Sequence, residues 1–196
     1  MNFSVVIVSF KSFHLIERYV QAIGNKQQII VIENSLDKNL KDKLEKLYSN
    51  VEVFIPERNL GYGAGLNLGI KKLKNNFVFC MSADLKVSKD CFLNISSIIS
   101  QFRDFSIIAP TYLDESIYKN YEIHDNQRVD LKNKKISKFI LKEVDEIDGA
   151  FLVINREKFS SSNIMDENIF LYFESTDLCL RLRKNNQKLY VVENLK

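Results

Sequence analysis

Short apolar runs alternate with amphipathic segments along the first half of the chain. The runs are rich in β-branched and aromatic residues, as in strands covered on both faces, and they occupy 3–10, 28–33, 51–55, 77–81 and 105–110. Between them, apolar residues recur at i, i+3, i+4 and i+7, which predicts helices over 12–23, 36–50, 64–76 and 88–102. This alternation predicts an α/β fold with a parallel sheet and helices on both faces.

The second half follows a different pattern. Residues 111–147 are polar and rich in Tyr and Lys, so no regular element is expected there. Strands are predicted over 149–154 and 188–193, with a helix over 174–186 between them. We expect Leu178, Cys179 and Leu182 of this helix to face the core.

Polar residues follow the predicted parallel strands at the points where they end. Ligands of open parallel sheets bind beyond the carboxyl ends of the strands. Those ends carry Ser9 and Phe10, Glu33 and Asn34, the stretch 56–63, and Ser82 to Asp84. We therefore expect a ligand to lie along this edge.

The composition is that of an ordinary globular domain, with 45% hydrophobic and 27% charged residues. A net charge of +3, with the basic residues dispersed, does not indicate a nucleic-acid partner. Three widely spaced cysteines predict reduced thiols in a cytoplasmic protein rather than a disulfide framework. The N-terminal apolar run is too short to span a bilayer.

A glycine-rich stretch, RNLGYGAGLNLGIKK, spans residues 58–72. It is not a P-loop, because no Lys-Ser/Thr pair follows the glycines. It also misses the G-x-G-x-x-G spacing of dinucleotide-binding turns and follows the third predicted strand instead of the first. Two interpretations remain for the stretch alone: a tight strand-to-helix turn, or a backbone that approaches a ligand closely.

Read in order, six blocks resemble the family 2 glycosyltransferases: VVIVSF, VIENSLD, ERNLGYGAGLNLGI, FCMSADLKV, IDGAFLVINREKF and DENIFLYFESTDLCLRLRK. The branch most similar is that of bacterial rhamnosyltransferase-like enzymes, and the resemblance covers nearly all of the chain except 111–147. It implies a GT-A fold, with a Rossmann-like, mainly parallel sheet, in a single domain over 1–196. Residues 1–110 would bind the nucleotide-sugar, and 111–196 would form an acceptor and catalytic half that is short at its C-terminus.

The resemblance also assigns residues to the donor. Ser9 and Phe10 match positions beside the base and ribose, and Glu33 and Asn34 match the acidic end of the second strand. The positions expected to wrap the nucleoside are Asn59, Gly61, Gly65 and Asn67.

Ser82 and Asp84 match the family's D-x-D metal motif, which implies a divalent ion, Mg or Mn, on the donor diphosphate. Asp84 is the single carboxylate there, and a plain turn residue is the alternative. The two histidines of the chain, His14 and His124, do not match the family's metal-binding histidine.

An inverting transfer needs a carboxylate that takes the proton of the acceptor hydroxyl. Ser175 occupies the family's usual base position, so Glu174 is the favoured substitute and Asp177, one helical turn on, is the second candidate. A dipole-stabilising role at the helix start is the alternative for Asp177. A protein that binds the donor without turning it over is the third alternative.

Asp148, Gly149, Asp166 and Glu167 match acceptor-side elements, although Asp166 also fits a cap. The acceptor would be a saccharide or a lipid-linked molecule. The basic stretch 131–142 favours a solvated helix face or loop, and contact with an anionic membrane surface is the alternative. The sequence thus predicts a cytoplasmic, metal-assisted glycosyltransferase that uses a donor such as dTDP-rhamnose, with a nucleotide-sugar-binding protein as the rival.

Overall fold

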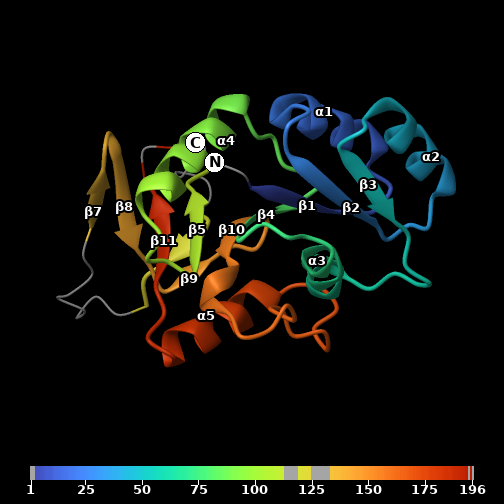
Figure 1. Cartoon of the computed structure of the whole chain (residues 1–196). Coiled ribbons are helices and arrows are strands. Elements are labelled where there is room, and N and C mark those ends of the chain that lie inside the picture. Colours follow the sequence, from blue (N-terminus) through green and yellow to red (C-terminus); the bar gives the residue numbers. More distant parts are fainter. Residues whose placement is uncertain (1–2, 113–118, 125–132, 194, 196) are drawn as a thin grey trace.

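A computed structural model describes residues 3–112, 119–124, 133–193 and 195 (Figure 1). The elements follow one another in the order β1 (Ser4–Ser9), α1 (Phe13–Ile23), β2 (Gln28–Glu33), α2 (Lys38–Leu47), β3 (Val51–Phe54), α3 (Tyr62–Lys71), β4 (Phe77–Ser82), α4 (Lys89–Gln101), β5 (Ile107–Pro110), β6 (Tyr121–Glu122), β7 (Lys134–Ile136), β8 (Phe139–Glu143), β9 (Glu146–Ile147), β10 (Phe151–Asn155), a 3-10 turn (Arg156–Lys158), α5 (Glu174–Lys184) and β11 (Leu189–Val192). Every strand and helix predicted from the pattern is present, with its bounds shifted by a few residues.

The central sheet has the strand order β3-β2-β1-β4-β10-β5-β11-β8-β7 (Figure 1). β1 to β4 pair in parallel, and β11 is parallel to β5. In the described sheet only β10 and β8 run against this common direction, which confirms the predicted, mainly parallel α/β sheet. β10 enters between β4 and β5, so the two halves of the chain share one sheet.

Helices cover both faces of the sheet (Figure 1). α1, α2 and α4 pack on one face, and α3 and α5 pack on the other. Along β1, Val5 and Ile7 join the first core cluster, whereas Val6 and Val8 join the second. Because both faces of β1 are covered, its sequence is a continuous apolar run.

The ends of the helices follow local signals. α1 ends at Gly24, where φ is +81°. The Asp37 side chain accepts the N–H groups of Asn39 and Leu40 at the start of α2, and Ser88 accepts that of Cys91 at the start of α4. None of the helices in the described ranges is both long and apolar enough to cross a membrane.

The expectation that 111–147 lacks regular structure is wrong for part of that segment. β6 and β9 form a small antiparallel sheet, and β7 and β8 form a hairpin at the edge of the main sheet. From 134 onward the basic stretch 131–142 is therefore a hairpin of two strands joined by a turn at 137–138, and not a helix. Its residues 131 and 132, including Lys132, lie outside the described residues. Phe139 and Leu141 point into the core and alternate with the exposed Ile140, a period of two that the helix-like spacing of apolar residues obscured.

Candidate functional site

A cavity of about 690 Å³ opens beyond the carboxyl end of β4, against β6, β9 and the start of α5. Its described lining consists of Tyr62, Ser82, Asp84, Lys119, Asn120, Tyr121, Glu122, Glu146, Asp148, Gly149, Ala150, Leu171, Tyr172, Phe173, Glu174, Ser175 and Thr176. This is the edge of the sheet where the parallel strands end and where a ligand is expected.

The cavity brings together five of the residues singled out from the sequence, from three distant segments: Ser82, Asp84, Asp148, Gly149 and Glu174. The backbone N–H of Ser82 donates to the carbonyl of Ala150 over 2.9 Å, which holds the end of β4 beside 148–150. The Tyr62 hydroxyl donates to the Gly149 carbonyl over 2.8 Å and so links α3 to the same wall.

Glu174, the first residue of α5, is the most buried carboxylate of the cavity, with 7% of its surface exposed. Its Oε2 has no hydrogen-bond partner among the described residues. Burial raises the pKa of Glu174 above its ordinary value, and the nearby Asp148 carboxylate raises it further. A carboxylate with a raised pKa in a cleft is suited to accept a proton.

The turn at Gly61 positions the segment that leads into α5. Gly61 has φ +80°, and a Cβ there would lie 1.9 Å from the carbonyl oxygen of Phe170. The Tyr62 N–H donates to that same oxygen over 3.2 Å. Tyr172 and Phe173 then adopt left-handed backbone angles, which reverse the chain so that α5 begins with Glu174 at the cavity. The glycine at 61 is thus required by a close approach of two backbones.

The residues expected to contact the nucleoside gather beside the cavity without lining it. The Asn34 N–H donates to the Ser9 carbonyl over 2.8 Å, and the Asn34 side chain donates to the Gly61 carbonyl over 2.9 Å. Asn59 accepts the Gly61 N–H, and Gly65 lies where a Cβ would be 3.1 Å from Val8.

Two side-chain oxygens in this group are buried and could bind a polar ligand. Ser9 Oγ and Glu33 Oε2 are buried and have no hydrogen-bond partner among the described residues. Buried polar groups are normally paired, so their neighbourhood suits a polar ligand. Phe10, by contrast, is 52% exposed at the end of β1.

Three other predicted positions lie apart from the cavity and contact one another or their own loop. Asn67 is buried in α3, where its Oδ1 accepts the N–H groups of Ile164 and Met165 at 2.9 Å. Its Nδ2 donates to Glu167 over 3.0 Å, and the Asp166 side chain accepts from Asn168. These contacts hold the segment before α5 against α3.

Asp177 also lies apart from the described cavity lining. It forms an ion pair with Arg181 at 2.7 Å, one turn further along α5. This pairing is the one expected for a helix-surface carboxylate.

The sequence reasoning missed several cavity residues. Lys119, Glu122 and Glu146 lie in the segment that showed no clear pattern, whereas Thr176 lies in the predicted helix 174–186 and was given no role. Residues 171–173 belong to a block that the resemblance quoted, yet their side chains stand exposed, with Phe173 at 75%. A run of large apolar residues directly before a helix that begins with a carboxylate was the available signal.

The side-chain oxygens at the end of β4 could bind a divalent cation. The Ser82 hydroxyl donates to the Asp84 carboxylate, and both side chains line the cavity. Hard cations such as Mg²⁺ and Mn²⁺ bind oxygen ligands, and Mg²⁺ in particular takes one or two carboxylates together with substrate phosphates.

Comparison with known proteins places the chain in a family. Residues 4–161 match the family described as Glycosyl transferase family 2, and the chain belongs to that family. It is similar to the low-salt glycan biosynthesis hexosyltransferase Agl10 of Haloferax volcanii, with 24% identity over 195 residues, 94% of this chain and 62% of that protein. It is also similar to the dTDP-rhamnosyl transferase RfbF of Shigella flexneri, with 22% identity over 175 residues, 86% of this chain and 58% of that protein.

A solved structure shows the same fold. The crystal structure of GalNAc-T7 with UDP, GalNAc and Mn²⁺ covers 98% of this chain and 42% of its own, with a TM-score of 0.72 and 18% identity. The likeness confirms the GT-A fold that the motif blocks implied. The chain spans about three fifths of the length of the two curated relatives.

Proposed function

We propose that this chain binds a nucleoside diphosphate sugar and transfers its hexose, with inversion, to a hydroxyl group of an acceptor. The observation that carries the proposal is that one cavity is lined by both Asp84, of the predicted metal motif, and the buried Glu174. The chain belongs to glycosyl transferase family 2. The names of the two curated relatives support a hexose, and one of them supports dTDP-rhamnose as the donor.

The strand ends would hold the nucleoside. Ser9 and Glu33 offer buried, unpartnered oxygens beside the turn that Asn34 fastens to Gly61. The start of α3 follows this turn, and a helix N-terminus favours a negatively charged group nearby. Asn67 would act indirectly, by holding the segment that precedes α5.

The diphosphate would lie toward Ser82 and Asp84. A divalent ion bound there supplies positive charge that stabilises the departing diphosphate. The oxygen donors of Ser82 and Asp84 suit Mg²⁺ and Mn²⁺, and the GalNAc-T7 structure contains Mn²⁺.

Glu174 would be the base. Its carboxylate takes the proton of the acceptor hydroxyl, the hydroxyl oxygen bonds to the anomeric carbon, and the bond from that carbon to the diphosphate oxygen breaks. Glu174 suits this role better than Asp177, because Glu174 lies on the cavity with a raised pKa, whereas Asp177 is paired with Arg181.

The acceptor would enter past Asp148, Gly149 and the exposed rings of Tyr172 and Phe173. Ring faces and carboxylates together suit a saccharide, whether free or lipid-linked. Asp166 and Glu167 lie away from the cavity lining, so the acceptor site proposed here rests on Asp148 and Gly149.

The test is transfer and donor hydrolysis with Mn²⁺, measured on dTDP-rhamnose and on UDP- and GDP-hexoses. Glu174→Gln keeps the shape of the side chain and should lower turnover by about 100- to 10,000-fold while the donor Kd changes little. Asp177→Asn is the matched control on the same helix and should retain turnover. Loss of turnover in Asp177→Asn with full activity in Glu174→Gln would reverse the assignment.

Ser175→Asp separates the enzyme from its rival. This change restores the acidic residue that the family usually carries beside Glu174, on the cavity wall. If donor binds but neither the natural chain nor Ser175→Asp turns it over, the chain is a nucleotide-sugar-binding protein.

A further inference from the structure

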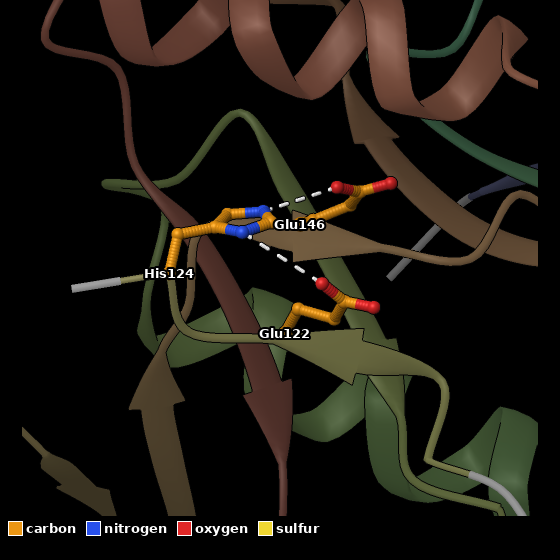
Figure 2. A group of neighbouring side chains, drawn as sticks. All are labelled: Glu122, His124 and Glu146. Carbon is orange, nitrogen blue, oxygen red and sulfur yellow. Dashed lines mark hydrogen bonds and ion pairs between the residues drawn. The ribbon is translucent and has the colours of Figure 1, made fainter. Parts of the chain in front are cut away.

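A cluster of potential metal ligands lies beside the cavity, and two of its members, Glu122 and Glu146, belong to the cavity lining. Figure 2 shows His124 between two glutamates, Glu122 on β6 and Glu146 on β9. His124 Nε2 lies 3.2 Å from Glu146 Oε2, and Nδ1 lies 3.7 Å from Glu122 Oε2. One ligand atom from each side chain falls within 4.8 Å of the other two. Ligands about 2.1 Å from a shared ion lie at most about 4.2 Å apart, so small side-chain rotations would bring both carboxylates to an ion on one imidazole nitrogen.

The cluster is held from outside by groups that would not bind the ion themselves. The Thr176 hydroxyl, in the first turns of α5, donates to Glu146 Oε1 and leaves Oε2 toward His124. The backbone N–H of His124 donates to Asp145 over 2.9 Å. Metal-binding carboxylates and histidines are typically oriented by such outer hydrogen bonds.

The cavity beside this cluster is acidic even without the cluster's own carboxylates. Besides Glu122 and Glu146, its described lining carries three carboxylates, those of Asp84, Asp148 and Glu174, against the single ammonium group of Lys119. Glu174 is 7% exposed, and its Oε2 accepts no hydrogen bond from the described residues. Buried carboxylate oxygens without partners are costly, and a bound cation offsets that cost. An anionic ligand would also be repelled from so acidic a cavity unless positive charge accompanied it.

We propose that Glu122, His124 and Glu146 form a divalent transition-metal site at the rim of the cavity. Two carboxylate oxygens and one imidazole nitrogen suit Mn²⁺ or Zn²⁺ better than Mg²⁺, which prefers oxygen ligands only. Glu122 and Glu146 line the same cavity as Asp84, so an ion held by them adds positive charge to that cavity. Ion binding here does not depend on the proposed transferase activity.

The experiment titrates Mn²⁺ into the full chain without nucleotide and follows the free-ion signal by electron paramagnetic resonance. His124→Ala should weaken binding by at least about tenfold, because it removes one ligand. His14→Ala is the matched control, since His14 is the other histidine of the chain and is exposed on α1. Thr176→Val keeps the side-chain shape and should weaken binding by about 10- to 100-fold through misorientation of Glu146. Thermal unfolding of each variant without metal checks that the fold is kept.

Retention of the nucleotide-free Mn²⁺ site in Asp84→Ala would support the proposal, as would nitrogen modulation from an imidazole in the spin-echo spectrum. The proposal is overturned if the chain without nucleotide binds no Mn²⁺, or if Asp84→Ala abolishes binding that His124→Ala leaves intact. Donor binding and turnover are measured separately, so a failed metal site and a failed transferase assignment give different results.

Discussion

Replacement of Gly61 by Ala tests whether the glycine turn positions the catalytic wall. Gly61 and Gly24 have nearly the same backbone angles, φ +80° and +81° with ψ −174° at both. They differ in their surroundings. A Cβ at Gly61 would lie 1.9 Å from the Phe170 carbonyl oxygen, whereas a Cβ at Gly24 would have nothing within 4 Å. Gly24→Ala therefore measures the backbone strain alone.

The strain shared by both variants is about 1–3 kcal/mol, the cost of a residue with a side chain in this backbone region. Gly61→Ala adds a steric term. Ordinary contact begins at 3.4 Å, so the two backbones must separate by about 1.5 Å to reach it. The overpacking costs about 1–3 kcal/mol, and the loss of the Tyr62 hydrogen bond adds about 0.5–1.5 kcal/mol. Since a misplacement of about 1 Å can lower a rate roughly 100-fold, turnover should fall by about that factor.

Urea unfolding followed by circular dichroism measures the free energy of unfolding of both variants, because the chain has no Trp to serve as a fluorescent probe. Donor hydrolysis or transfer measures the effect on the site. We expect Gly61→Ala to lose more stability than Gly24→Ala and to lose turnover, while Gly24→Ala keeps turnover. Equal losses of stability together with normal turnover in Gly61→Ala would refute the role of this contact in placing residues 170–174.

Two further changes test the energetics of the site. Because the pKa of Glu174 is raised in the folded chain, its ionised carboxylate costs stability at neutral pH, and that cost disappears as the pH falls below the ordinary value of 4.5. Glu174→Gln should therefore be more stable than the natural chain at neutral pH and lose this advantage in acid. A difference in stability that does not depend on pH would contradict this expectation. Asn67→Ala leaves the N–H groups of Ile164 and Met165 without their acceptor and should lower the free energy of unfolding by about 2 kcal/mol or more. The exposed Asn39→Ala serves as its control, and equal unfolding midpoints in urea for the two variants would contradict the role given to Asn67.

The spacing of apolar residues was sufficient to predict the strands that are buried on both faces and the helices that bury one stripe of residues. The run predicted as a strand over 28–33 is β2, Gln28–Glu33, and the helix predicted over 12–23 is α1, Phe13–Ile23. These predictions succeed because the spacing of apolar residues is a property of a few consecutive positions. The motif blocks were equally local, and they sufficed for the family and for the fold.

Tertiary structure decided what depends on pairing between distant segments. β10 lies antiparallel between β4 and β5, and no spacing within 151–155 specifies those neighbours. The hairpin of β7 and β8 turns at Ser137, whose φ is +54°. Glycine or asparagine at this position would have predicted the turn, but serine does not.

The site shows the same division most clearly. The sequence marked Asp84, Asp148 and Glu174 as chemical candidates, but only the fold brings these residues to one cavity and separates Asp177 from it. It also joins Glu122, His124 and Glu146, which share no motif. Residue type and local spacing carry the chemistry that a side chain can perform. Proximity between side chains tens of residues apart arises when strands pair and helices pack, because those contacts alone repay the entropy of closing the intervening loops.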